Sequence, residues 1–354
     1  MSQKSAIMPA ERSVTRVTIS DVAAALNLTK STVSRAMNGY PDISQATQLR
    51  VKRMAEQMNY QPLSQAQAIR TGRTRSLGLV LQLADHDAQR PFLAEFLAGL
   101  SEGATTAGYT LTVASADSDA HLTETIRALL RERKADGFIL PRSMVNDPRV
   151  ALLRAATVPF VLFGRQDDAD ECSWFDIRGE DAMRDAVLHL AALGHSRIGF
   201  VNGGTQYTYA KLRGDGFAQG MAQAGLEVDH NLIVENAVTM EEGAQAASRL
   251  LDMPHTPTAI ICALDQVALG VYQTAADRKL SIGRDLSIIG YDGILEGTHL
   301  RPPLTTFSVD NKQAGAKLAA LLIMRIQGAP AEELRETVSA TFIQRGSTGP
   351  CPVA

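Results

Sequence analysis

Cysteine is scarce in this sequence of 354 residues, and its three cysteines lie too far apart for a disulfide framework or a zinc site. No stretch approaches the ~20 apolar residues that a membrane-spanning helix requires. The first 17 residues are polar and contain no apolar segment typical of a signal peptide. These absences predict a protein of the reducing cytoplasm that holds no structural metal ion.

Motifs of nucleotide-binding and catalytic sites are also missing. The sequence contains neither GxGxxG nor GxxxxGK[ST], so a dinucleotide site or a P-loop has little support. It offers no spacing that would pair a nucleophile with a general base. We therefore expect neither an enzyme nor a bound cofactor.

Positive charge, by contrast, is concentrated at the start of the chain. Residues 1–75 hold eleven basic and four acidic side chains, a net charge of +7, whereas the whole chain carries −3. The remaining residues therefore carry −10. A basic segment on an acidic body favours contact with a polyanion, although a solvated basic arm has the same composition.

Three short helices are predicted within that basic segment. Ser20 can cap a first helix over residues 21–27, and Thr29 can cap a second helix that ends before Asn38-Gly39. Ser44 can cap a third helix that ends near residue 59. Only Asn27 and Leu28 separate the first two helices, so these must approach closely. An apolar seam would join the helices, made of Val22, Leu28, Val33, Met37, Val51, Met54 and Met58.

This arrangement is a helix-turn-helix, whose second helix enters the major groove of DNA. Lys30, Ser31 and Arg35 are predicted to face outward from that helix and to contact base edges. Short polar side chains around them suit phosphate contacts that fix the register on DNA: Thr18, Thr29, Thr32, Ser34 and Asn38. A helical hairpin that binds nothing has similar spacing, but the positive charge favours the DNA-binding interpretation.

The segment after the third helix is a predicted linker. Pro62 ends the helix, and residues 63–69 could form about two helical turns, too short to be stable alone. The sequence RTGRTR at residues 70–75 would then form a flexible basic joint.

The order VTISDVAAALNLTKSTVSRAMNG, NYQP and a short hinge before an α/β body resembles the lactose/galactose-repressor (LacI/GalR) family of bacterial transcription regulators. The resemblance covers essentially the whole chain. It implies that the hinge folds on operator DNA and places apolar side chains in the minor groove, at the positions of Ala66 and Ile69. The family usually has Asn after the hinge Pro, whereas this chain has Leu63.

From residue 76 onward, short apolar runs alternate with amphipathic stretches, which indicates parallel sheets covered by helices on both faces. We expect an α/β body of two Rossmann-like lobes, similar to periplasmic binding proteins, after an all-α headpiece. The chain should pass between the lobes after PFVLFGR and return at TTFSVD. The predicted domains are the headpiece 1–61, the hinge 62–75, the body 76–345 and a tail 346–354. Strands are expected at 76–83, 109–116, 136–143, 159–165, 197–203, 259–265 and 287–293.

Ligands of such sheets bind beyond the carboxyl ends of the strands. Arginine, carboxylate, amide and aromatic side chains follow several predicted strands, and together they suit a sugar. By resemblance, Arg213 (in RGDGF) and Asp292 (in GYD) match effector-binding residues of the family. The candidates are Phe92, Arg165, Tyr207, Tyr209, Arg213, Asp265, Gln266 and Asp292.

Several of these candidates have a structural alternative. Asp265 could instead cap the helix that follows it, and Arg165 could form a salt bridge. Arg213 could be a surface helix residue, and the two tyrosines could be exposed loop residues. Where relatives have polar or aromatic contacts, this chain has Leu264, Asn311 and the pair Asp176-Ile177, so its pocket differs from that of the lactose repressor. A larger sugar or oligosaccharide is expected, and an α-glucoside is one candidate.

The sequence thus predicts a sugar-responsive repressor that binds a pseudo-palindromic operator. No leucine heptad follows the body, so the resemblance implies a homodimer. A ligand-dependent activator would share every one of these residues. A soluble sugar-binding protein without a regulatory role is the remaining alternative.

Overall fold

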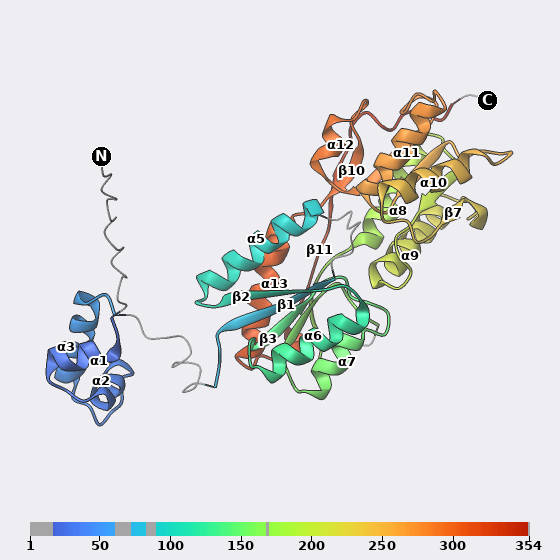
Figure 1. Ribbon diagram of the computed structural model, residues 1–354. Helices are drawn as coiled ribbons and strands as arrows, with labels where there is room; N and C mark the ends of the chain where they lie inside the picture. The colour runs from blue at the N-terminus through green and yellow to red at the C-terminus, as the bar shows by residue number, and fades with distance from the viewer. Residues whose placement is uncertain (1–16, 61–71, 83–89, 168–169, 353–354) are drawn as a thin grey trace, which may run out of the picture. The chain divides into compact units, whose positions relative to one another are not determined.

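The computed structural model describes residues 17–60, 72–82, 90–167 and 170–352 (Figure 1). The chain divides into two compact units, Met1–Thr74 and Arg75–Ala354, close to the predicted end of the hinge. Ala66 and Ile69, the predicted minor-groove residues, lie outside the described residues. In the part of the chain that is described, no helix has the length and apolar character needed to cross a membrane.

The described part of the first unit is the predicted three-helix headpiece. Its helices are α1 (Ile19–Leu26), α2 (Lys30–Met37) and α3 (Gln45–Gln57). Thr29 and Ser44 cap α2 and α3 as predicted, accepting hydrogen bonds from Thr32 N and Thr47 N at 3.1 and 3.3 Å.

The predicted cap of α1 was wrong, because Thr18 and not Ser20 precedes the helix. Thr18 is extended, with φ −107° and ψ 166°, and its backbone N and Oγ1 both donate to Asp21 Oδ2 at 2.7 and 2.8 Å. These bonds lower the pKa of the Asp21 carboxyl, the backbone bond from Thr18 contributing most. An acid three residues after Thr18 therefore sets where α1 begins.

A small apolar core joins the three helices of the headpiece. Val22, Val33 and Val51 are fully buried in it. The connection between α1 and α2 is short because Asn27 adopts the left-handed conformation at φ 53°, which asparagine tolerates better than most residues. The rest of the predicted seam is partly buried against this core, as expected: Leu28, Met37, Met54 and Met58.

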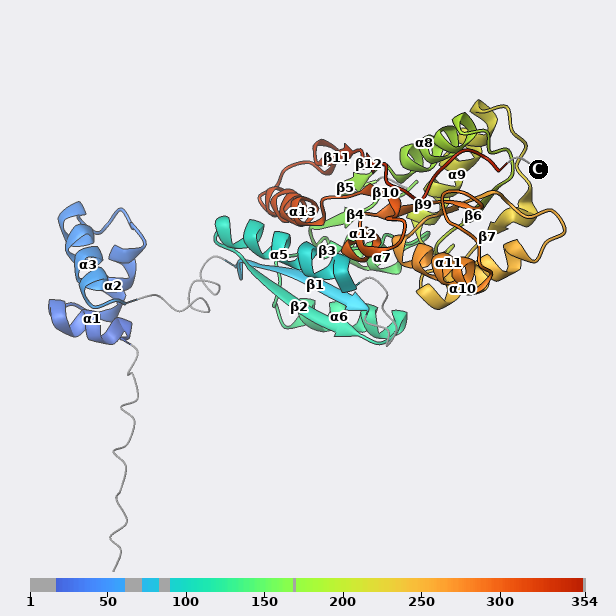
Figure 2. The same cartoon turned by 90° about the horizontal axis from the view of Figure 1, so that it is seen from above.

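The second unit contains two lobes, each built on a six-stranded sheet (Figure 2). The sheet of the first lobe has the order β11-β5-β4-β3-β1-β2, and its strand pairings are all parallel. Its strands are β1 (Ser76–Gln82), β2 (Thr110–Ala116), β3 (Gly137–Leu140), β4 (Phe160–Phe163), β5 (Ser173–Ile177) and β11 (Arg335–Val338).

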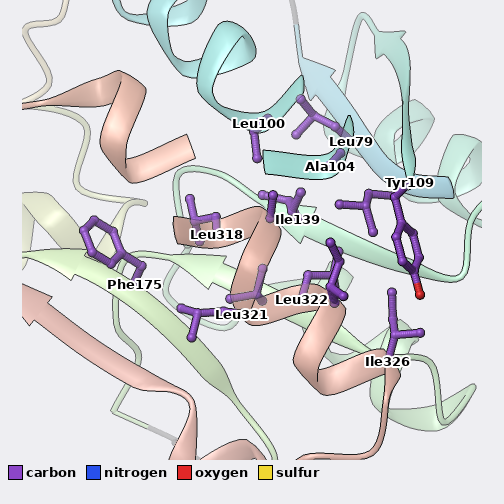
Figure 3. Close-up of a cluster of buried hydrophobic side chains, with 14 of the residues drawn as sticks. Leu79, Leu100, Ala104, Tyr109, Ile139, Phe175, Leu318, Leu321, Leu322 and Ile326 are labelled. Carbon is purple, nitrogen blue, oxygen red and sulfur yellow. The ribbon is translucent and has the colours of Figure 1, made fainter. Parts of the chain in front are cut away.

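Helices cover both faces of this first sheet. The helices α5 (Arg90–Thr106) and α13 (Asn311–Ile326) lie side by side on one face, where Leu100, Leu318 and Leu322 are buried against Leu79 and Ile139 (Figure 3). On the other face, α6 (Asp119–Arg131) and α7 (Pro148–Ala155) contribute to a second apolar cluster. The predicted doubly covered parallel sheet is therefore confirmed.

The second lobe repeats this plan with the order β12-β10-β9-β8-β6-β7, in which only the outermost strand β12 is antiparallel to its neighbour. Its strands are β6 (Ile198–Val201), β7 (Ile233–Val234), β8 (Ala259–Cys262), β9 (Ser287–Asp292), β10 (Thr305–Ser308) and β12 (Thr341–Ile343). The helices are α8 (Gly179–Ala192), α9 (Thr208–Gln223), α10 (Met240–Leu251), α11 (Asp265–Asp277) and α12 (Leu295–His299), with a short 3₁₀ turn at His230–Leu232, while a second 3₁₀ turn at Ala331–Glu333 lies in the first lobe beside β5.

Within the described residues, the chain passes between the lobes three times. The first two passages, from β5 to α8 and from β10 to α13, confirm the predicted switch and the predicted return. The third passage, from β11 to β12, was not predicted. These segments place the carboxyl ends of strands from both lobes around one space.

The last described residues are part of the second lobe and do not form a separate tail. Ser347 is fully buried, and its Oγ accepts from Thr305 N at 2.7 Å and donates to Ile288 O at 2.6 Å. Farther along, Cys351 N donates to Leu193 O at 2.8 Å. The segment therefore adds backbone and side-chain bonds to the sheet of this lobe.

Candidate DNA-binding surface and ligand cleft

The three predicted base-reading residues lie on the exposed side of α2. Val33 and Ala36 are buried against the headpiece core, and this fixes the rotation of the helix. The side chains left exposed include Lys30, Ser31 and Arg35, as the sequence predicted. All three lie on one short helix, which Val33 and Ala36 hold against the core.

The predicted phosphate-contacting residues are in part engaged with one another. Thr29 Oγ1 and Thr32 Oγ1 are 2.8 Å apart, and Asn38 Nδ2 donates to Ser34 O at 2.6 Å. Thr18 is bonded to Asp21, as described above. These bonds orient exposed hydroxyl and amide groups at the two ends of α2 and at the start of α1, where they remain open to solvent.

In the second unit, a cavity lies between the two lobes at the carboxyl ends of their strands. Four of the predicted ligand contacts line it: Phe92, Tyr209, Arg213 and Asp292. Phe92 belongs to a group of stacked rings, with ring centroids 5.1 Å from Phe96 and 5.9 Å from Phe163. The cavity therefore has stacked rings on its first-lobe side, and Arg213 and Asp292 on its second-lobe side.

Arg213 projects from α9 into this wall and is only 8% exposed. Its guanidinium lies 3.9 Å from the ring centroid of Tyr291 and 4.8 Å from that of Tyr209. Nη1 donates to the carbonyl of Ala263 at the end of β8. These contacts hold the planar cation in one orientation, so the alternative of a surface helix residue is wrong.

Asp292 ends β9 with the unusual backbone angle φ 125°, which few residues other than glycine adopt. Backbone strain of this kind is concentrated at functional sites. Burial raises the pKa of its carboxyl to about 7, and the positive charge of Arg213 opposes that increase. A strained, half-buried carboxylate beside a fixed arginine is typical of a binding site.

Arg165 does not line the cavity and instead forms the predicted alternative, a salt bridge. Its Nε lies 2.6 Å from Asp176 Oδ2, and its Nη2 lies 2.5 Å from Glu180 Oε1. Asp176 does line the cavity, and burial raises the pKa of its carboxyl to about 6, against the effect of Arg165. Arg165 thus orients a carboxylate of the cavity wall that was not among the predicted contacts.

Asp265 lies away from the cavity wall, so the structure does not support its predicted role as a ligand contact. The side chain is fully buried, and it accepts hydrogen bonds from Gly293 N, Ile294 N and Thr306 Oγ1 at 2.7, 2.9 and 2.7 Å. Its structural alternative was also wrong, because Leu264 is the N-cap of α11 and Asp265 is the first helical residue. Asp265 instead holds the loop directly after Asp292.

Gln266 and Tyr207 lie near the cavity but do not line it. Gln266 borders an adjoining chamber, which also touches Phe92 and Asp292 and is wider, about 470 Å³ against about 110 Å³. Tyr207 is the N-cap of α9, and its ring stacks on that of Tyr209 with centroids 5.6 Å apart.

One side of the cleft is fastened by direct contacts between the lobes. Thr208 donates to Ser143 O from both its backbone N and its Oγ1, at 2.9 and 3.1 Å. Nearby, Lys211 Nζ lies 2.6 Å from Asp167 Oδ2. Because Ser143 and Thr208 also line the cavity, this interlobe contact lies next to the ligand space.

Sequence reasoning missed several residues that line the cavity. Arg142 and Ser143 follow β3 directly, so the rule that selected the other candidates would have found them too. Leu264, Asn311 and the pair Asp176-Ile177, which depart from the family pattern, also line it, although none of them was a predicted contact. The others missed were Phe163, Gly164, Gly179, Thr208, Leu212, Tyr291 and Val309.

Comparison with known proteins agrees with both units. Residues 18–63 match the family described as bacterial regulatory proteins of the lacI family, and residues 187–348 match a periplasmic binding protein-like domain. The chain is 34% identical over 341 residues to the HTH-type transcriptional regulator AglR of Rhizobium meliloti (strain 1021), covering 95% of each protein.

Two solved structures extend this similarity to the fold. The complex of the transcriptional regulator CelR with cellobiose has a TM-score of 0.72 and 27% identity, covering 94% of this chain and all of the other. The lac repressor dimer bound to operator and the anti-inducer ONPF has a TM-score of 0.79 over 94% of this chain and 99% of the other. At 24% identity, this second likeness concerns the fold alone.

Proposed function

Since the chain belongs to the lacI family of bacterial regulatory proteins and is a DNA-binding transcriptional regulator, we propose that it represses sugar-utilisation genes in response to a sugar. Its relatives are transcriptional regulators rather than enzymes. The observation that carries the proposal is the interlobe cavity, in which Arg213 and Asp292 face an aromatic wall.

The chemistry of the cavity favours a neutral, hydroxyl-rich ligand. Guanidinium and carboxylate groups form paired hydrogen bonds with neighbouring hydroxyls, and an aromatic ring packs against the C–H face of a sugar. The narrower chamber holds both signs of charge, with Arg142 and Arg213 beside Asp176 and Asp292, and the adjoining chamber adds only acids, so the lining does not favour an anionic ligand.

The two chambers together favour more than one sugar ring. The narrower chamber is lined by Arg142, Asp176 and Arg213, and the wider adjoining chamber by Glu95, Gln266 and Asp310, while Phe92 and Asp292 line both. The CelR complex contains cellobiose, a disaccharide, which agrees with this size. An oligosaccharide such as an α-glucoside is our proposed ligand class.

For DNA, we propose a homodimer that binds a pseudo-palindromic operator, one headpiece per half-site. Lys30, Ser31 and Arg35 would contact bases, and Thr18, Thr29, Thr32, Ser34 and Asn38 would contact phosphates. Ala66 and Ile69 would enter the minor groove from a hinge that folds on DNA. A ligand that favours one arrangement of the lobes would then change operator affinity by its differential affinity for the two states.

The test combines a ligand screen with operator binding. Sugars and sugar phosphates are screened for an increase in the melting temperature of the full chain, and each hit is added to a complex with an operator selected from random DNA. We expect a neutral oligosaccharide to stabilise the protein and weaken the complex. Stabilisation by sugar phosphates alone would contradict the proposed ligand class.

Arg213→Ala and Arg213→Lys are the informative variants, because Arg213 lies in the cavity wall. Both should retain operator binding and lose at least about 10-fold in ligand affinity, which corresponds to one lost charged hydrogen bond. Arg184→Ala is the matched control, since Arg184 pairs with Asp181 and Asp185 on α8, outside the cavity. An unchanged ligand response in the Arg213 variants would show that the cleft has been wrongly assigned.

A further inference from the structure

Arg35, the proposed base-reading arginine, is held by two residues of the turn that follows α2. Its Nη2 pairs with Asp42 Oδ2, and its guanidinium lies over the ring of Tyr40, 5.3 Å from the ring centroid. The side chains of Arg35 and Asp42 are 46% and 48% exposed. The pair therefore lies on the surface of the headpiece, where it joins α2 to the turn that follows it.

The turn that carries these two residues is itself fastened to the headpiece. Tyr40 N donates to Arg35 O at 3.1 Å, which closes the end of α2. Tyr40 O accepts from Ile43 N and from Gln48 Nε2, both at 3.0 Å, and Gln48 belongs to α3. Because the backbone on either side of Asp42 is bonded in this way, its carboxylate has a defined position from which to hold an arginine.

The stability of the headpiece does not explain the presence of Asp42. An ion pair between two half-exposed side chains contributes little to folding, because water and salt screen it. On a surface that approaches phosphates, a negative charge also opposes DNA binding. An acid in this place must therefore have an effect that compensates for the repulsion.

That effect is the orientation of the guanidinium. An arginine reads guanine by two parallel hydrogen bonds to O6 and N7, and this requires a fixed plane. A free arginine on a basic surface would instead turn towards phosphates, which bind it regardless of sequence. Contact with a carboxylate and with an aromatic ring restricts that motion of the guanidinium before DNA is bound and lowers the entropy lost on binding.

We propose that Asp42 and Tyr40 are positioning residues for Arg35, so that the base preference of α2 depends on the turn after it. This inference rests on the proposed function, because it requires Arg35 to read a base. It predicts that removing the charge of Asp42 lowers sequence discrimination while raising affinity for unrelated DNA.

The experiment measures a ratio of affinities with the full chain. Binding to a selected operator, to single-base variants of it and to random DNA is followed by fluorescence anisotropy at one salt concentration. The variants are Asp42→Asn, Arg35→Ala, their double mutant and Tyr40→Leu. Glu56→Gln is the matched control, because Glu56 is an exposed acid of α3 in the same headpiece and its loss changes the net charge equally.

At the base pair whose preference disappears in Arg35→Ala, we expect Asp42→Asn to lower discrimination at least threefold and Tyr40→Leu to lower it less. Asp42→Asn in the Arg35→Ala background should then have no further effect on that preference. Glu56→Gln should strengthen binding to every sequence by a similar factor and leave the preference unchanged.

Two results would overturn the inference while leaving the proposed function intact. In the first, Asp42→Asn strengthens binding to every sequence by a similar factor and leaves the base preference unchanged, as Glu56→Gln does, so that Asp42 contributes only its charge. In the second, Asp42→Asn alters the preference at a different base pair, with or without Arg35, so that Asp42 reads a base itself. A wild-type protein without any sequence preference would overturn the proposed function instead.

Discussion

A buried carboxylate is stable only where hydrogen bonds replace the water it has lost. Asp265 meets this condition through Gly293 N, Ile294 N and Thr306 Oγ1. Its bonds join the start of α11 to the loop after β9 and to β10. The residue therefore holds the loop after Asp292 from outside the cavity.

Replacing Asp265 by alanine should lower the free energy of unfolding by about 3 kcal/mol, because the buried donors would lose their acceptor. Urea unfolding of the full chain measures this loss. Asp277→Ala is the control, since Asp277 is an exposed residue of α11, and its effect should stay within about 0.5 kcal/mol. Equal effects of the two substitutions would show that Asp265 has no structural role.

Asp292 should make stability depend on pH. Its pKa rises from an ordinary value of 3.8 to about 7 in the folded chain, so the folded state binds this proton more tightly than the unfolded state. The charged form opposes folding, and the contribution of this group to stability should therefore decrease as pH rises from about 4 to about 7. Asp292→Asn should remove that decrease.

Melting temperatures of the wild type and of Asp292→Asn at pH 5 and pH 8 test this sign. We expect the difference between the two proteins to shift in favour of the variant at the higher pH. Asp176, whose pKa burial raises to about 6, remains in both proteins and cancels in the comparison. Melting temperatures that differ equally at the two pH values would contradict the raised pKa of Asp292.

Individual contacts were predicted from the sequence where position alone decided them. Polar residues at the carboxyl ends of strands lie at the cleft edge of a parallel sheet, which placed Asp292 there, and the family resemblance added Arg213 on α9. The direction of a side chain at that edge depends on its hydrogen-bond and ion-pair partners. Arg165 is ion-paired with Asp176 and Glu180 and does not line the cavity. Such partners come from distant segments that local patterns do not identify.

At the scale of elements, the sequence predicted strands with continuous apolar runs and missed the others. The strand β5 contains Asp176 within only five residues, and β11 is the polar sequence RETV at the edge of its sheet. An edge strand needs no apolar side chains on both faces, so it lacks the pattern that identifies buried strands. Asp176 lies in β5, an inner strand of this sheet that the sequence did not predict, and it was noted as a departure from the family but not as a predicted contact.

Helix pairs in both lobes pack through glycine. On α9, a Cβ at Gly216 would lie 2.1 Å from Glu180 O of α8, while a Cβ at Gly214 would have no neighbour closer than 3.7 Å. The same helix thus contains one glycine required by close packing and one that the packing does not require. Alanine normally stabilises a helix relative to glycine by about 1 kcal/mol.

Gly216→Ala and Gly214→Ala should therefore change stability in opposite directions. We expect Gly216→Ala to lower the free energy of unfolding by at least about 2 kcal/mol, because α8 and α9 would have to separate. Gly214→Ala should raise it by up to about 1 kcal/mol. Chemical denaturation of both variants measures the difference, and a stabilising Gly216→Ala would show that the two helices are not in close contact.

The whole molecule has two binding functions that should respond differently to salt. The first 75 residues carry +7 and the remainder −10, so any attraction to DNA arises from the headpiece and hinge. Binding of Lys and Arg to phosphates releases counterions, and affinity then falls steeply as salt rises. A neutral sugar carries no charge, so its binding releases no counterions.

We therefore expect operator affinity to fall at least about 100-fold between 50 and 200 mM salt, while ligand affinity changes less than about twofold. Anisotropy titrations with labelled operator and calorimetric titrations with the ligand measure the two responses in one protein.

The variant Lys30→Ala tests which contact Lys30 makes. Loss of a phosphate contact lowers the slope of log affinity against log salt by about 1, whereas loss of a base contact relaxes sequence preference instead. If operator binding proved insensitive to salt, the positive charge of the headpiece would need another explanation. A ligand affinity that fell equally steeply would indicate an anionic ligand and contradict the neutral sugar.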